Sequence, residues 1–227
     1  MPSTAEFRIN TLKNFIIPDL IRAQSRCCFI LESPHTTEIT KRIPVCGATG
    51  KVMSEVLLKK SIPLGQLIYM DDDAAAGLSI MNACPIPLQA TCYDAHDCHP
   101  QLVEISNART LRTGSLIKDK ENFKLHFKFG IGLEIVEDFR SRLQNCVTEE
   151  SCRRFVVCGV AAQCIFELAT RVFGKYRWSV PLDVFNHTIY VYYDNHPSEL
   201  SGESVSKWKL PGHAQELLGF IDYNDAG

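Results

Sequence analysis

Apolar residues along the chain gather in four short runs, and each run precedes a segment whose apolar residues recur at helical spacing. The runs are residues 27–32 (CCFILE), 77–83 (GLSIMNA), 154–159 (RFVVCG) and 187–193 (HTIYVYY). Runs in which nearly every residue is apolar are typical of strands that are buried on both faces, as in a parallel sheet.

Amphipathic helices are predicted over residues 50–61, 132–147, 160–174 and 210–221. Gly174 is expected to end the third of them. The long stretch that follows the second strand is expected to be irregular up to residue 132. Strands that alternate with helices predict an α/β fold of three layers (αβα), in which four parallel strands lie between helices. No internal repeat is found, and we expect one domain over residues 1–227.

Polar side chains follow three of the four predicted strands. Glu32 begins the sequence ESPHTTE after the first strand, Asn82 ends the second, and NHPSELS (195–201) follows the fourth, whereas GVAAQ follows the third. Because the carboxyl ends of parallel strands meet at one edge of a sheet, where ligands bind, these polar groups are expected to converge.

The composition is that of an ordinary globular protein, with 227 residues, of which 45% are hydrophobic and 22% charged. No run of 18 or more apolar residues predicts a membrane span, and the first residues do not have the layout of a signal peptide. The ten cysteines lie within apolar segments, which predicts reduced thiols and a cytoplasmic location, or a nuclear one in a eukaryote.

The net charge is only −2, but the charges are unevenly distributed. Residues 71–104 hold six acidic residues and no Lys or Arg, whereas residues 109–128 hold six basic residues, Arg109 and Arg112 among them, and two acidic ones. This segregation permits a basic face that contacts phosphates. The alternative is that these charges lie on solvated faces of helices and loops.

The three polar strand ends resemble, in order, the motifs of the uracil-DNA glycosylase superfamily. HPSELS differs by one residue from the HPSPLS of the best-known branch. The segment from Glu32 to Gly50 resembles the GEAPG and RPFVGRAG motifs of the iron–sulfur branch, with Pro34, Pro44 and Gly47 in register. The resemblance covers more than half of the chain, and it implies strand order 2-1-3-4 and cleavage of the N-glycosidic bond of uracil, or of a related deaminated base, in DNA.

The resemblance implies that Asn82 and His196 recognise and activate the base. The amide of Asn82 would donate to uracil O4 and accept from N3–H, a pattern that cytosine inverts. The neutral imidazole of His196 would donate to O2, where the leaving uracil gathers negative charge. The alternatives are that Asn82 caps a turn and that His196 bonds only to backbone.

The same resemblance assigns a carboxylate and two lining residues to the first motif. Glu32 would orient water or stabilise the developing cation on the sugar. Glu38 is the second choice for this role, and otherwise a solvated loop acid. Pro34 and His35 would line the base pocket, with His35 where a tyrosine of the best-known branch excludes the methyl group of thymine.

Contacts with DNA are expected from the last motif and from the basic stretch. Pro197 and Ser198 would lie along the DNA backbone, and Leu200 would fill the space left by the extruded base. Local packing is the alternative for Leu200. Arg109 and Arg112 would contact phosphates.

Two departures from the family bear on cofactors and activity. Cys27 and Cys28 are adjacent within a strand, where the iron–sulfur branch has Cys-x-x-Cys upstream, so we expect no cluster and no other cofactor. Val45 replaces the phenylalanine that stacks on the base, which would weaken base capture by ~1–3 kcal/mol. Phe29 or Tyr93 could replace that ring.

A second group of chemically active side chains lies close together in sequence, and it is an alternative metal site. Zinc prefers two pairs of ligands that are separated by a longer loop, so this compressed group is not expected to bind metal. Its members are Cys92, His96, Cys98 and His99.

We therefore expect a monomeric, cofactor-free DNA glycosylase that acts on uracil-containing DNA. One alternative is a weak member of the superfamily that binds nucleic acid or uracil without efficient excision. Another is an enzyme that acts on small nucleosides or nucleotides, which would not need Leu200 or a basic face.

Overall fold

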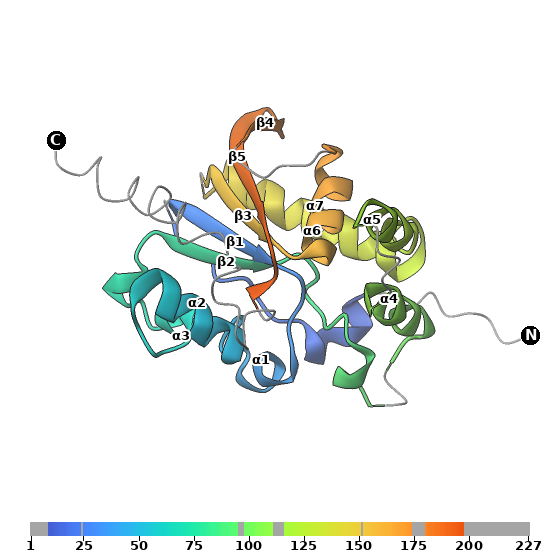
Figure 1. The fold of residues 1–227 in the computed structure, drawn as a ribbon, viewed down its shortest axis with the longest axis horizontal. Helices are drawn as coiled ribbons and strands as arrows, with labels where there is room; N and C mark the ends of the chain where they lie inside the picture. The colour runs from blue at the N-terminus through green and yellow to red at the C-terminus, as the bar shows by residue number, and fades with distance from the viewer. Residues whose placement is uncertain are drawn as a thin grey trace, which may run out of the picture.

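A computed structural model describes residues 9–23, 25–94, 98–110, 116–150, 152–173 and 180–197. A five-stranded sheet runs through the centre of the protein between two layers of helices (Figure 1). Its strands lie in the order β2-β1-β3-β5-β4. Their bounds are β1 Cys27–Leu31, β2 Leu78–Asn82, β3 Arg154–Cys158, β4 Val180–Val184 and β5 His187–Asp194.

Successive residues of the central strands enter two different cores, as the two-residue period of a strand requires. On β1, Cys28 and Ile30 face the larger core, whereas Cys27, Phe29 and Leu31 face the smaller one. All five residues of β1 are buried. The uninterrupted apolar run therefore reflects burial on both faces of the sheet.

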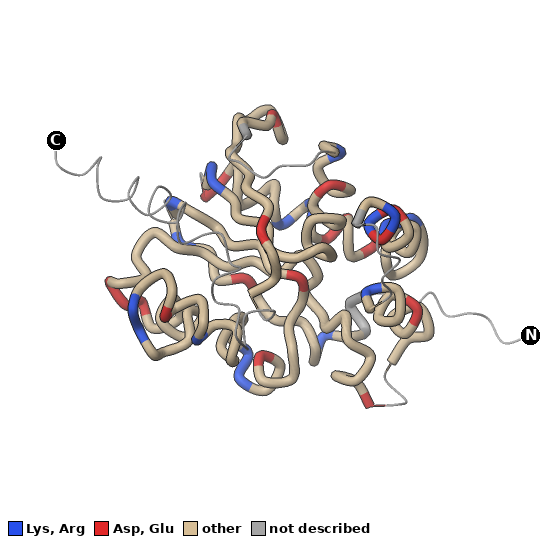
Figure 2. Tube along the Cα trace, viewed as in Figure 1, with Lys and Arg blue, Asp and Glu red and all other residues tan. Residues whose placement is uncertain are grey.

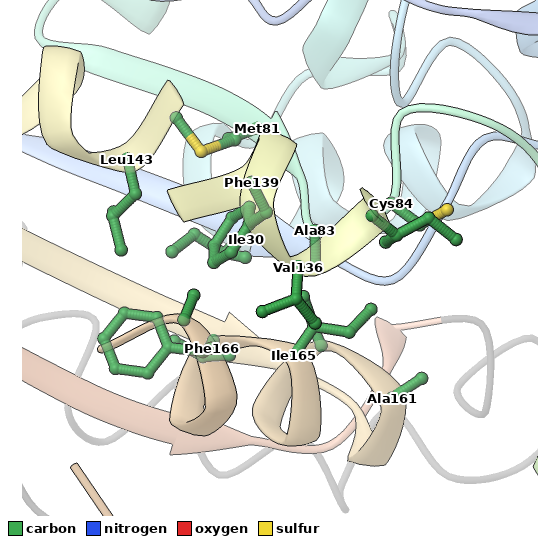
Figure 3. Packing of buried hydrophobic residues seen from close by; sticks show 14 of the residues in the cluster. Ile30, Met81, Ala83, Cys84, Val136, Phe139, Leu143, Ala161, Ile165 and Phe166 are labelled. Atoms are coloured by element: carbon green, nitrogen blue, oxygen red, sulfur yellow. The ribbon is translucent and has the colours of Figure 1, made fainter. Parts of the chain in front are cut away.

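The larger core lies between the sheet and a layer that contains α4 (Pro100–Thr110), α5 (Leu116–Leu125), α6 (Gly130–Thr148) and α7 (Val160–Thr170). Figure 3 shows Phe139 and Val136 of α6 and Phe166 and Ile165 of α7 close to Ile30 of β1. Apolar residues at three- and four-residue spacing on α6 supply this contact, which agrees with the helix predicted there.

The smaller core lies on the other face of the sheet, under α2 (Ala48–Leu58) and α3 (Leu64–Tyr69). Met53 of α2 and Leu64 of α3 are fully buried there. The short helix α1 (Thr36–Lys41) contributes no buried residue and lies in the loop after β1. Three short 3-10 helices complete the described elements: η1 (Ile9–Phe15), η2 (Asp73–Ala75) and η3 (Ala90–Cys92).

The prediction of an α/β protein is confirmed, but the sheet has five strands where four, all parallel, were predicted. Four strands are parallel and follow the order β2-β1-β3-β5, and β4 pairs antiparallel with β5 at the edge. Phe185 and Asn186 join β4 to β5 with φ of 54° and 63°. A two-residue turn with both φ positive is a hairpin of type I′. Pro181 is tolerated in β4 because an edge strand can spare one donor.

The stretch after β2 is also more ordered than predicted, because it contains α4 and α5. Their sequences are polar around most of the helix, so the hydrophobic pattern is weak, and a few buried side chains such as Phe123 fix them to the core. The third predicted helix ends earlier than expected: α7 ends at Thr170, and Arg171 adopts the left-handed conformation with φ of 60°. Gly174 and the helix predicted over residues 210–221 lie outside the described residues.

All ten cysteines are free, and eight of them are buried. Burial raises the pKa of Cys28 to about 11 and that of Cys84 to about 12, so both thiols are protonated. Cys27 and Cys28 face opposite sides of the sheet, so they cannot share one metal ion. Within the described ranges, no helix is long and apolar enough to cross a membrane.

Candidate functional site

A cavity of about 290 Å³ opens at the carboxyl ends of β1, β2 and β5, near the small end of the range for ligand pockets. Its walls come from these strand ends, from the loop between β1 and α2, and from α4. They are formed by Leu31, Glu32, Ser33, His35, Thr37, Glu38, Val45, Gly47, Ala48, Thr49, Asn82, Gln89, Arg109 and His196. The structure thus brings Glu32, Asn82 and His196 to one cavity.

Asn82 places an unsatisfied amide in this cavity. It is the last residue of β2 and only 1% exposed. Neither Oδ1 nor Nδ2 has a hydrogen-bond partner among the described residues. A buried amide without partners costs free energy, which a ligand with a matching donor and acceptor would recover. Asn82 therefore does not cap a turn within the described chain, and its amide is free to bind a ligand.

Glu32, directly after β1, is held by three hydrogen bonds. Oε2 accepts from Nε of Arg109 at 2.9 Å and pairs with Nη2 of the same residue at 2.7 Å. Oε1 accepts from the backbone N–H of Ala161 at 3.1 Å. Ala161 lies in the first turn of α7, where a carboxylate also complements the helix dipole. The Glu32 carboxylate is thus held in place at the cavity wall.

Gly159 makes room for the two candidate catalytic side chains. A Cβ on Gly159 would lie 2.6 Å from Oε1 of Glu32 and 3.0 Å from Cβ of His196, and the residue has φ of 92°. Both constraints exclude a side chain here. Gly159 was not predicted as a site residue, although a glycine directly after a buried strand is a signal for close approach of another chain segment.

His196 lies two residues after β5 and is half-buried at the cavity wall. Pro197 beside it is buried. Ser198 and Leu200, which were assigned to DNA contacts, lie outside the described residues. The strand end therefore directs His196 toward the cavity that Asn82 and Glu32 share.

Glu38 lines the cavity and is not a solvated acid, because it organises the loop after β1. Its carboxylate accepts the backbone N–H of His35 at 2.7 Å and also the backbone N–H of Val45. Burial raises the pKa of Glu38, although these hydrogen bonds oppose the shift. The carboxylate thus closes the loop that forms one wall of the cavity.

Val45 lines the cavity in an unusual conformation. It is 3% exposed and has φ of 55°, which is rare and strained for a β-branched residue. Its carbonyl accepts from the N–H of Gly65 at 3.1 Å, and a Cβ on Gly50 would lie 1.8 Å from that carbonyl oxygen. The two glycines and Glu38 together hold Val45 in place.

The aromatic residues considered as substitutes for a stacking ring do not line the cavity. Phe29 is buried in the smaller core. Tyr93 packs against Phe15 with ring centroids 4.6 Å apart, and its hydroxyl donates to the Pro87 carbonyl at 2.7 Å. The suggestion that either ring replaces the missing phenylalanine is therefore wrong. A base in the cavity would meet the side chain of Val45 instead.

His35 and Gln89 line the cavity, whereas Pro34 does not. His35 is exposed, whereas Pro34 is buried. Gln89 was not predicted; its Oε1 lies 3.5 Å from Oγ of Ser33. Only the fold reveals Gln89, because it follows β2 by several residues in an irregular segment.

Three basic residues of the stretch 109–128 pair with glutamates in the described part of the chain. Arg109 points into the cavity on Glu32, and Lys120 and Lys124 pair with Glu167 of α7 at 3.3 and 2.8 Å. Figure 2 shows basic and acidic segments interspersed on α5. Arg112 lies outside the described residues.

The alternative metal site is not assembled in the part of the chain that is described. Sγ of Cys92 lies 3.7 Å from Oγ1 of Thr36, and Nδ1 of His99 accepts the N–H of Gln101. No group of three or more His, Cys, Asp or Glu side chains among the described residues is placed to hold a metal ion. His96 lies outside these residues.

No protein-family model matches this chain, and no curated protein matches it by sequence.

Proposed function

We propose that this protein is a monofunctional DNA glycosylase that hydrolyses the N-glycosidic bond of uracil, or of a related deaminated base, in DNA. The observation that carries the proposal is the buried amide of Asn82, which has no partner among the described residues and lies in the same cavity as Glu32 and His196. Four parallel strands in the order β2-β1-β3-β5 support a uracil-DNA glycosylase-like fold with an added edge strand.

Asn82 accounts for base recognition. Nδ2 donates to O4 of an extruded uracil, and Oδ1 accepts from N3–H. Cytosine presents a donor and an acceptor in the reverse order, so its binding would leave both groups of the buried amide unsatisfied. Such a mismatch is costly as long as the amide keeps this orientation, and it then favours uracil over cytosine.

His196 and Glu32 account for bond cleavage. His196 donates to O2 of the departing base, where negative charge develops. Glu32 uses three of its roughly four acceptor positions on Arg109 and Ala161, so one position on Oε1 remains for a water molecule. The negative carboxylate also stabilises the positive charge that develops on the sugar. No cofactor takes part in these steps, and the protein acts on DNA as a monomer.

A second function, binding of uracil or nucleic acid without efficient excision, is favoured by two observations. Val45 offers no aromatic face to the base. Arg109 neutralises Glu32, which weakens the carboxylate as a base and as a stabiliser of the sugar cation. Val45 and the Arg109–Glu32 ion pair would leave recognition by Asn82 intact and lower the rate of cleavage.

The test is incubation with single- and double-stranded oligonucleotides that carry one uracil, followed by alkaline cleavage at abasic sites. Strand cleavage at the uracil position is expected for the parent protein and not for Asn82→Asp, because a carboxylate cannot donate to O4. Asn107→Asp makes the same chemical change on an exposed face of α4 and serves as the control.

Retention of uracil-containing DNA without cleavage would support the second function. A third outcome is that the protein hydrolyses free deoxyuridine while it neither binds nor cleaves the oligonucleotides. That result would support an enzyme of small nucleosides and would reject both the glycosylase and the binding function.

A further inference from the structure

A buried ion pair lies directly behind Asn82 and holds its main chain. Oδ1 of Asp19 accepts the backbone N–H of Asn82 at 3.2 Å, and Nη1 of Arg142 donates to the backbone carbonyl of Asn82 at 3.0 Å. The two side chains join each other through Nη1 of Arg142 and Oδ2 of Asp19 at 2.7 Å. Both backbone polar groups of one residue are therefore bound by one charge pair.

The pair is assembled from distant parts of the chain. Asp19 lies between η1 and β1, and Arg142 lies on α6. They expose only 11% and 22% of their side chains. A buried ion pair is expensive to desolvate and is often no more stable than apolar residues of the same size. The ion pair instead fixes the orientation of the Asn82 peptide groups, because charged groups form directional hydrogen bonds with the backbone and apolar side chains do not.

Asn82 needs such support more than the other residues of β2. Its side-chain amide has no bond among the described residues to orient it, so its position depends on the backbone that carries it. Ladder bonds continue just beyond it, from Ala83 N–H to the Leu31 carbonyl at 2.7 Å and from Cys84 N–H to the Glu32 carbonyl at 2.9 Å. The carbonyl and N–H of Asn82 are thus fixed together with the strand end that bears Glu32.

We propose that Asp19 and Arg142 are positioning residues that hold the Asn82 amide at the orientation required to recognise its ligand. The part of this inference that concerns base selectivity rests on the proposed glycosylase function. The part that concerns the geometry of Asn82 does not. A displacement of about 1 Å is enough to weaken a two-point hydrogen bond substantially, so loss of the pair should act on selectivity.

The decisive variant is Asp19→Leu together with Arg142→Met, which removes both charges and both bonds to Asn82 while it keeps an apolar core. Asp138→Asn is the matched control: Asp138 bonds Nε of Arg142 at 2.7 Å but does not touch Asn82. Asp19→Ala removes the acceptor of the Asn82 N–H alone, and it replaces the double variant if that protein does not fold.

The first measurement is hydrogen exchange of the Asn82 backbone amide in the ¹⁵N-labelled protein. We expect the Asn82 amide to exchange at least tenfold faster in the double variant, or in Asp19→Ala, after correction for any change in global stability. We expect no such change in Asp138→Asn. Unchanged protection in the folded variant would overturn the inference, whatever the activity of the protein.

The second measurement is the preference for uracil over cytosine in the oligonucleotide assay. The preference should fall at least tenfold in the same variant, with a smaller effect on affinity for uncut DNA. If the parent protein does not act on uracil, the proposed function is rejected and hydrogen exchange alone decides the positioning role. Selectivity that survives faster exchange would show that Asn82 is oriented by its ligand, and would also overturn the inference.

Discussion

Two glutamates, Glu32 and Glu167, are buried in this protein, and both pair with basic residues of the stretch that the sequence marks as unusually positive. Glu32 binds Arg109 at the cavity. Glu167, on α7, binds Lys120 and Lys124 of α5 between two helices. Burial alone would lower the pKa of Lys124, but its hydrogen bonds with Glu167 and Glu121 outweigh that effect and raise it.

The difference between the two glutamates lies in what else they touch. Glu32 shares a cavity with an unsatisfied amide and a histidine. Its bonds to described residues leave one acceptor position on Oε1 for a further ligand. Glu167 does not line that cavity, and both of its oxygens are bound by lysines. Burial and ion pairing therefore do not distinguish a candidate site carboxylate from a structural one. The open cavity and the unsatisfied amide beside Glu32 do.

Removal of each charge in turn should separate stability from activity. Glu167→Gln leaves two lysines beside a buried neutral amide and should lower the free energy of unfolding by about 3–5 kcal/mol. Its rate of uracil excision, measured below the unfolding temperature, should stay near that of the parent.

Glu32→Gln should show the opposite balance. Turnover should fall roughly 10²–10⁴-fold, the range for a lost catalytic acid or base, because a neutral amide is neither a base for water nor a counter-charge for the sugar cation. Its stability should change less, since Arg109 can reach solvent. Urea denaturation and the oligonucleotide assay measure both quantities. Equal losses of stability in the two variants would remove the distinction between the two glutamates.

His196→Ala tests the other side of the same cavity. It should lower turnover roughly 10²–10³-fold, the effect of losing one donor to a developing anion. Affinity for DNA should remain nearly unchanged, because the donor acts mainly in the transition state. His187→Ala, at the opposite end of β5, is the control. Excision at the parent rate by His196→Ala would mean that the histidine only ends a strand.

The remaining lysines of the basic stretch test whether any part of it contacts phosphates. Lys118 and Lys128 are exposed, unlike Lys120 and Lys124. Replacement of both exposed lysines by alanine should reduce the slope of log affinity for DNA against log salt by about two units. Lys59→Ala with Lys60→Ala, at the end of α2, is the control. An unchanged slope in the variant that lacks Lys118 and Lys128 would mean that these lysines do not contact DNA phosphates.

The smallest effect is expected from the pH dependence of Glu38. Because its pKa is raised in the folded state, the folded protein binds this proton more tightly than the unfolded chain does. The resulting stabilisation is present at low pH and is lost as the pH rises through the folded pKa. Relative to Glu38→Gln, the parent should therefore gain stability from about pH 7 to about pH 4. Glu55→Gln, on an exposed face of α2, should show no such trend.

The sequence predicted the four parallel strands because each is buried on both faces, and such burial requires an apolar residue at nearly every position. It did not predict β4, whose run is interrupted by Pro181 and Asp183 and which is only an edge strand. It also missed α4 and α5, because helices with few buried positions have little hydrophobic periodicity.

Some residues of the candidate site could likewise be predicted from the sequence, and others could not. Glu32, Asn82 and His196 could be named from the sequence, because residues at the ends of parallel strands must share one edge of the sheet. Their partners could not be named. Arg109 is 77 residues from Glu32, and Arg142 is 60 residues from Asn82.

The backbone of Val45 and the space at Gly159 likewise depend on elements that approach from other parts of the chain. A local pattern records which face of an element is buried. Pairing of charges and close approach depend on distances between elements, and only the folded chain fixes those distances.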